Sequence, residues 1–186
     1  MNFNKHSELE GKHAYLSASK YHWLNYSDEK LAESYNNFLA IEMGTRLHAL
    51  AKEHIELSIK MPRNKKTFNM YVNDAIGFRM TPEQPLYYSE NCFGTADAIA
   101  FSKNVLRIHD LKTGVSPASM NQLKIYNALF CLEYSVDPKD ISMISRIYQL
   151  NDIIEEEQDA EEIKHIMNTI IHFDNIVKQI KSGEWQ

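Results

Sequence analysis

The chain has 186 residues, of which 44% are hydrophobic and 24% are charged. These values predict one soluble domain with a single core, with a small appendage as an alternative, and exclude a disordered, collagen-like or disulfide-stapled chain. Two cysteines, Cys92 and Cys131, are too few for a four-cysteine iron–sulfur cluster or zinc ribbon within one chain. No apolar run approaches the roughly 20 residues of a membrane-spanning helix. A polar start without a secretory leader favours a cytoplasmic protein with no membrane partner.

The net charge of −5 is unevenly distributed along the chain. Residues 1–150 hold 17 Lys+Arg and 16 Asp+Glu, whereas residues 151–186 hold 3 and 9. The acidity therefore belongs to the C-terminal part and does not argue against nucleic-acid binding by the rest. The densest basic cluster comprises Lys60, Arg63, Lys65 and Lys66. It predicts a solvated loop, with contact to phosphate groups as the alternative.

Two helical segments are expected before the sheet. Within 15–26, Ser17 or Ser19 is a candidate N-cap for a short aromatic-rich helical turn. Over 37–60, apolar residues recur at spacings of three, four and seven, which predicts an amphipathic helix ended by Pro62. The residues of its expected buried stripe are Leu39, Met43, Leu47, Leu50 and Leu57.

The periodicity changes to two between Pro82 and Gly114, which predicts neighbouring strands at 93–101 and 105–112. A two-residue turn at Lys103-Asn104 would use the tolerance of asparagine for positive φ. In that register, residues whose numbers sum to 207 face each other. The facing pairs on one side are Thr95 with Lys112, Asp97 with Asp110, and Ile99 with Ile108.

This register brings two carboxylates and an ammonium together at one site. Like charges opposed across a ladder are destabilising unless a cation lies between them or one carboxylate is protonated. Asp97, Asp110 and the backbone carbonyl of Leu111 supply the oxygen ligands that Mg²⁺ prefers. Lys112 can hold a water molecule and neutralise developing charge on a phosphate.

Two alternatives to this convergence remain open. A three-residue turn would oppose Asp97 to His109 and send the two aspartates to different faces. Asp110 and Lys112 could also form an ordinary surface ion pair, which contributes little to stability.

The remaining elements complete an α/β pattern. Ser116-Pro117 resembles an N-cap followed by proline, which predicts a helix over 117–133 with Gln122 and Tyr126 on one face. A strand is expected at 141–150 and a helix with an acidic start at 155–181. The stripe expected to be buried on that helix comprises Ile163, Ile166, Ile170, Phe173, Val177 and Ile180.

Several short motifs occur in a recognisable order. They are GTRLH at 44–48, GTAD at 94–97, IHDLKTG at 108–114 and QLKIY at 122–126, preceded by HAYLSASKYHWLNY at 13–26. In GTRLH, Gly44 lies one helical turn before His48 and would leave space beside its imidazole. This order resembles the RecB-like branch of the PD-(D/E)XK nuclease superfamily, together with its phage exonuclease-type relatives.

The resemblance implies a restriction-endonuclease-like core at about 37–150 within a single domain spanning 1–186. It implies that the metal ligands are His48, Asp97, Asp110 and the Leu111 carbonyl. Lys112 would be the catalytic lysine, and Gln122 and Tyr126 would support it from a QxxxY helix. Many relatives also carry a glutamate on the preceding strand, for which Glu83 and Glu90 are both candidates.

The implied function is a Mg²⁺- or Mn²⁺-dependent deoxyribonuclease. We expect an exonuclease acting at DNA ends in phage recombination or repair, in the cytoplasm of a bacterial host. Partners would be DNA and either further copies of the chain or a recombination protein. The alternatives are a catalytically silent module that binds nucleic acid or a host protein, and an unrelated globular protein.

Overall fold

The computed structural model describes residues 5, 7, 11–12 and 14–184. The chain divides into two compact units, Met1–Met43 and Gly44–Gln186. The boundary falls inside the first α-helix, α1 (Asp28–Glu56). Every candidate catalytic or metal-binding residue belongs to the second unit.

The first unit holds the 3₁₀ helix η2 (Ala18–Asn25) and the start of α1. The helical turn expected within 15–26 is present as this 3₁₀ segment. Ser17 stands at its N-cap position, but its hydroxyl bonds Ser19 instead of capping the helix. The ring of Tyr15 packs against Tyr35 and Phe38 of α1. His13, the first residue of the HAYLSASKYHWLNY motif, lies outside the described residues.

Helix α1 is shifted towards the N-terminus relative to the expected 37–60. It ends because Ser58 adopts a left-handed conformation with φ 55°, so Pro62 is not the terminator. The buried face also differs from the expected leucine stripe. In the second unit, Ala51 and Ile55 are buried, whereas Leu50 and Leu57 are 41% and 62% exposed. Ala51 and Ile55 pack in one hydrophobic cluster with Tyr71, Val72 and Leu111.

Helix α2 (Thr67–Gly77) was not predicted from the sequence. It buries Tyr71, Val72 and Ala75, which lie at helical spacing. The helix directly follows the basic cluster. Because its apolar face is short and adjoins polar sequence, the periodicity did not reveal it.

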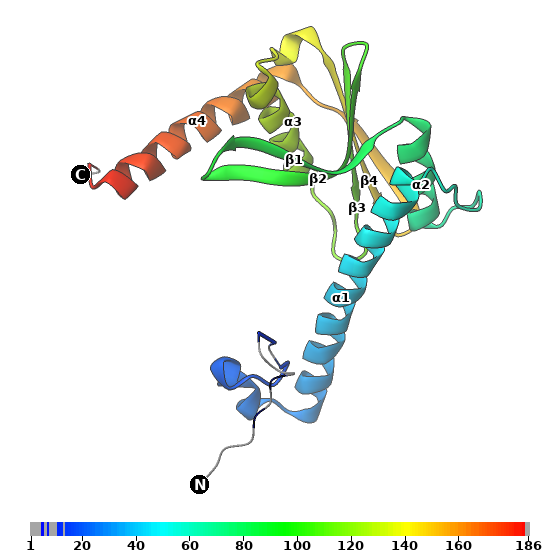
Figure 1. Cartoon of the computed structure of the whole chain (residues 1–186), viewed down its shortest axis with the longest axis vertical. Coiled ribbons are helices and arrows are strands. Elements are labelled where there is room, and N and C mark those ends of the chain that lie inside the picture. The colour runs from blue at the N-terminus through cyan, green and yellow to red at the C-terminus, as the bar shows by residue number, and fades with distance from the viewer. Residues whose placement is uncertain (1–4, 6, 8–10, 13, 185–186) are drawn as a thin grey trace. The chain divides into compact units, whose positions relative to one another are not determined.

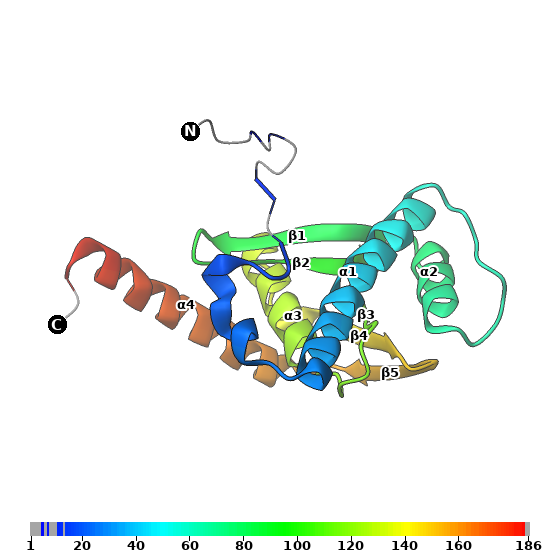
Figure 2. The same cartoon turned by 90° about the horizontal axis from the view of Figure 1, so that it is seen from below.

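Five strands form one sheet in the order β1-β2-β3-β4-β5. They are β1 (Thr81–Ser89), β2 (Cys92–Ser102), β3 (Val105–Leu111), β4 (Ser142–Gln149) and β5 (Asp152–Glu157). Neighbours are antiparallel except β3 and β4, which are parallel. Figure 2 shows β1 and β2 side by side along their length. The mixed sheet flanked by helices confirms the α/β fold class and is consistent with a nuclease-like core.

The β2–β3 hairpin has the predicted register. Ile99 pairs with Ile108 and Ser102 with Val105. The two turn residues, Lys103 and Asn104, have φ of 51° and 59°, as a two-residue hairpin turn requires. The three-residue turn is therefore excluded.

Helix α3 (Asn121–Tyr134) connects the parallel strands β3 and β4. It begins four residues later than expected, so Ser116 and Pro117 do not cap it. Instead, Nε2 of Gln149 donates hydrogen bonds of 2.7 and 2.8 Å to the carbonyls of Gly114 and Ser116. The segment is held as a loop against β4, and this pairing prevents an earlier start of the helix.

The expected strand at 141–150 is present as β4, but the expected helix at 155–181 begins later. Its first residues belong to β5, which returns along β4 through a turn at Leu150-Asn151 with φ of 51° and 63°. The last helix, α4 (Ala160–Ser182), is capped by Asp159, whose carboxylate accepts a hydrogen bond from the Glu162 amide.

Only the first half of the predicted α4 stripe is buried. Ile163 is fully buried, and Ile166 and Ile170 pack partly against the same cluster. Phe173 and Ile180 are 58% and 56% exposed, since the second half of the helix extends past α3.

Two hydrophobic clusters lie on opposite faces of the sheet. The larger one joins α3 and α4 to the face that carries Leu106 and Ile108. The smaller one joins α2 and the end of α1 to the face that carries Leu111 and Tyr148. Figure 1 shows the sheet between α3 on one side and α2 on the other. Among the described residues, no helix combines the length and apolarity needed to cross a membrane.

Candidate metal and catalytic site

The site begins where the β2–β3 ladder stops. The last pair in the ladder is Ala98 with His109. Beyond it, the backbone N–H of Leu111 donates a 2.8 Å hydrogen bond to Oδ2 of Asp97. The expected pairs of Asp97 with Asp110 and of Thr95 with Lys112 therefore lie outside the ladder, because a side chain replaces the backbone acceptor.

Three acidic or imidazole side chains meet at this point. Nδ1 of His48, on α1, lies 3.5 Å from Oδ2 of Asp97 and 3.7 Å from Oε1 of Glu83. One ligand atom from each of the three residues lies within 4.8 Å of the other two. The side chains of His48, Glu83 and Asp97 are 30%, 32% and 13% exposed, respectively, so the cluster is accessible yet largely shielded from water. Such a set of nitrogen and oxygen donors suits a divalent cation.

The structure distinguishes Glu83 from Glu90. Glu83 lies on β1 between the pairs Pro82–Ala98 and Gln84–Ala96, across from Asp97. Its φ is 49°, a left-handed conformation that is strained for glutamate and that accumulates at functional sites. Glu90 instead lies beyond β1, 3.3 Å from Nζ of Lys181 on α4.

A hydrogen-bonded chain leads from Asp110 to α3. Nζ of Lys112 donates to Oδ1 of Asp110 at 3.1 Å and to Oε1 of Gln122 at 2.8 Å. The amide nitrogen of Gln122 donates to the Tyr126 hydroxyl at 3.0 Å. The four predicted residues are therefore brought together: Gln122 contacts the lysine, and Tyr126 contacts Gln122.

Burial and like charges make the aspartates poor anions in the absence of a cation. Burial, followed by the charge of Asp110, raises the pKa of Asp97 from 3.8 to about 6. Burial also raises the pKa of Asp110, and its neighbour Lys112 opposes that shift. Oδ2 of Asp110 is buried and accepts no well-aligned hydrogen bond, although the Lys112 ammonium lies 3.0 Å away. Two buried aspartates with raised pKa values, together with a third carboxylate at Glu83, fit a bound divalent cation.

Tyr71 on α2 is a site neighbour that sequence reasoning missed. Burial raises the pKa of its phenol, and the charges of Asp97, Glu83 and Asp110 raise it further. The phenol thus stays protonated beside the carboxylates and forms part of their low-dielectric wall. The sequence feature that could have predicted Tyr71 is the helical spacing of apolar residues within 67–77.

Two glycines allow close approach around the site. A Cβ on Gly44 would lie 2.8 Å from Oγ1 of Thr113, so this glycine makes room for the loop after β3, not for the His48 imidazole as expected. A Cβ on Gly94 would lie 2.9 Å from Cε1 of Tyr126. Both close contacts connect motifs that are distant in sequence.

A family model described as "Protein of unknown function (DUF2800)" matches residues 80–175. This is just over half of the chain, which therefore belongs to that family. The matched region contains Glu83, Asp97, Asp110 and Lys112, whereas His48 precedes it. No curated protein and no solved structure was found to match the chain.

Proposed function

We propose that this DUF2800 protein hydrolyses DNA phosphodiester bonds in a reaction that depends on Mg²⁺ or Mn²⁺. The observation that carries the proposal is a cluster of possible ligands formed by His48, Glu83 and Asp97. Asp110, paired with Lys112, lies near enough for its charge to raise the pKa of Asp97. Carboxylates alone would suit many cation sites. A lysine held among them adds a group suited to a phosphate reaction.

The proposed cation ligands are His48, Glu83, Asp97 and Asp110, with the carbonyl of Leu111 as a further oxygen. When bound, the cation supplies Lewis acidity to the phosphate and lowers the pKa of the attacking water. The imidazole among the oxygen donors favours tolerance of Mn²⁺ alongside Mg²⁺.

Lys112 is proposed to act on the reacting groups directly. Asp110 and Gln122 accept two of its three N–H donors, which leaves the third for a water molecule or a phosphate oxygen. Its positive charge then stabilises negative charge that develops on the phosphate. Gln122 is a positioning residue, since it touches the ammonium, and Tyr126 positions Gln122.

The finer assignment rests on the resemblance to RecB-like and phage exonuclease-type nucleases. By that resemblance, the enzyme acts at DNA ends in phage recombination or repair within the bacterial cytoplasm. It would work together with further copies of the chain or with a recombination protein.

A cleavage assay tests the proposal. Purified protein is incubated with end-labelled linear DNA and with closed circular DNA in Mg²⁺, Mn²⁺ or EDTA. We expect loss of the linear substrate only with metal, loss of this activity in Lys112→Ala, and full activity in Lys103→Ala. Lys103 is a matched control because it lies in the hairpin turn at the opposite end of β3.

The same assay addresses the binding-module alternative. A folded protein that cleaves neither substrate in either metal would contradict the nuclease proposal. Metal-independent DNA binding that Asp97→Ala leaves unchanged would then favour a catalytically silent module.

A further inference from the structure

We propose that residues 60–66, here called the basic loop, bind the phosphate backbone of the DNA strand that enters the site. This inference rests on the proposed nuclease function and identifies the surface that holds its substrate. The basic loop connects α1 to α2 and contains Lys60, Arg63, Lys65 and Lys66.

The cations of the basic loop have no acidic partners. All four side chains are exposed, and within the described part of the chain none forms an ion pair. Two other exposed lysines differ in this respect. Lys139 pairs with Glu161 and Lys178 with Asp174. Clustered, unpaired like charges repel each other, and a polyanion removes that repulsion.

The basic loop is held in place by two asparagines of α2. Asn73 accepts a hydrogen bond from the Met61 amide at 2.9 Å and donates one to the Met61 carbonyl at 3.1 Å. Asn69, which is buried, donates to the carbonyl of Pro62 and to the side chain of Asn64. The backbone that carries the cations is therefore ordered before any ligand arrives, which lowers the entropic cost of binding.

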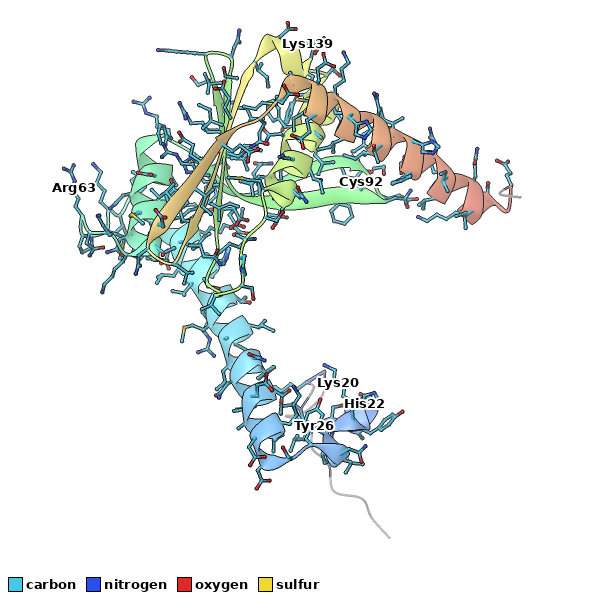
Figure 3. The ribbon with its side chains drawn as sticks, turned by 180° about the vertical axis from the view of Figure 1, so that it is seen from behind. Lys20, His22, Tyr26, Arg63, Cys92 and Lys139 are labelled. Carbon is cyan, nitrogen blue, oxygen red and sulfur yellow. The ribbon has the colours of Figure 1, made fainter. Side chains whose placement is uncertain are left out.

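A groove lies between the start of α2 and the Lys112 end of the candidate site. Its volume is about 290 Å³, and its walls include Thr67, directly after the basic loop, and Lys112 with Thr113 and Gly114. In the proposal, a strand whose phosphate is held at Lys112 passes Thr67 at the start of α2 and reaches the basic loop beyond the end of this groove. Figure 3 shows Arg63 on this loop with its side chain directed outwards, and Lys139 at a separate edge of the same unit.

Binding to a phosphate backbone has a measurable salt dependence. Each cation that neutralises a phosphate releases counterions, which adds about 0.9 to the slope of log K against log salt for duplex DNA. Replacing two such cations by glutamine should therefore lower the slope by about 1.8.

The test uses the full chain and a short fluorescein-labelled duplex. Anisotropy is measured in EDTA over a series of NaCl concentrations for the unmodified protein, for Lys65→Gln/Lys66→Gln, and for Lys103→Gln/Lys139→Gln. The last variant has the same net charge change at another surface. Cleavage of the same duplex in Mg²⁺ and Mn²⁺ is measured in parallel.

We expect the Lys65/Lys66 variant to bind DNA more weakly and to show a smaller slope of log K against log salt. We also expect it to cleave with a raised KM and an unchanged kcat. The Lys103/Lys139 variant should retain the original slope. Equal slopes in all three proteins, or equal losses in both variants, would overturn the assignment of the basic loop while leaving the nuclease proposal intact. Absence of cleavage by the unmodified protein would instead overturn the nuclease proposal. Cleavage is measured separately from the salt dependence, so the two proposals can fail independently.

Discussion

The backbone N–H of Leu111 is hydrogen-bonded to Oδ2 of Asp97 at the point where β2 and β3 separate. One carboxylate thus closes the hairpin and also faces His48 and Glu83. The structural and the proposed metal-binding roles of Asp97 can be separated. A neutral side-chain oxygen can accept the Leu111 hydrogen bond, but the proposed metal-binding role needs the negative charge.

Asp97→Asn should keep the fold and lose metal binding. The amide oxygen can still accept the Leu111 hydrogen bond, but it lacks the charge that attracts a divalent cation. We expect the Tm of the unmodified protein to rise on addition of Mn²⁺ and the Tm of Asp97→Asn to stay constant. At pH 4, where the Asp97 carboxyl is protonated, Asp97→Ala should also lower the Tm without metal, because it leaves the Leu111 amide unpaired. An equal Mn²⁺ response in Asp97→Asn would exclude this residue as a ligand.

The raised pKa of Asp97 makes the metal-free protein less stable at neutral pH. Between the ordinary pKa of 3.8 and the folded-state value of about 6, the folded state binds more protons than the unfolded state. Stability therefore falls as pH rises through this window. The raised pKa of Asp110 acts in the same direction.

Urea unfolding in EDTA at several pH values measures this effect. We expect the unfolding midpoint to decrease between about pH 4 and pH 7, and Asp97→Asn to flatten the profile. Added Mn²⁺ should stabilise most at the alkaline end, where both carboxylates are ionised. A midpoint that increases over the same range in the absence of metal would contradict the burial argument.

Glu83 and Glu90 form a matched pair for testing the third carboxylate. Glu83→Gln removes the negative charge beside His48, so we expect weaker Mn²⁺ binding by calorimetry and a higher metal requirement for cleavage. Glu90→Gln removes only an exposed contact to Lys181 and should change neither quantity. Identical behaviour of the two variants would remove Glu83 from the ligand set.

Gln122 should matter through the position of the Lys112 ammonium. Gln122→Ala removes the 2.8 Å hydrogen bond to Nζ, so the ammonium can move towards Asp110. We expect kcat to fall by roughly 10–100-fold with KM nearly unchanged, as for a lost orienting contact. Asn121→Ala, one position earlier on α3, serves as the control. A change confined to KM would point to substrate binding by Gln122 instead.

The central hairpin was predictable because its signals are local. Alternating polar and apolar residues and an asparagine at the turn define the register, and the register places Asp97 and Asp110 together. The residues around them were harder to assign. Whether Glu83 or Glu90 joins the site depends on a left-handed residue in β1 and on the position of Lys181 in α4, neither of which is visible in periodicity.

The errors in the helices have tertiary causes. The acidic residues 155–157 suit a helix start, but a tight turn at Leu150-Asn151 pairs them with β4. The proline at 117 suits a first helical turn, but Gln149 binds the adjacent carbonyls. In both places, a partner distant in sequence overrides a local preference.

The hairpin that carries Asp97 and Asp110 also has a consequence for folding kinetics. Its two strands are joined by two residues, and such hairpins close within about 1–10 μs, well before non-local strand pairing. Two like charges therefore approach each other at an early step of folding. A divalent cation that screens them should accelerate refolding, and the same acceleration should be absent when asparagine replaces either aspartate.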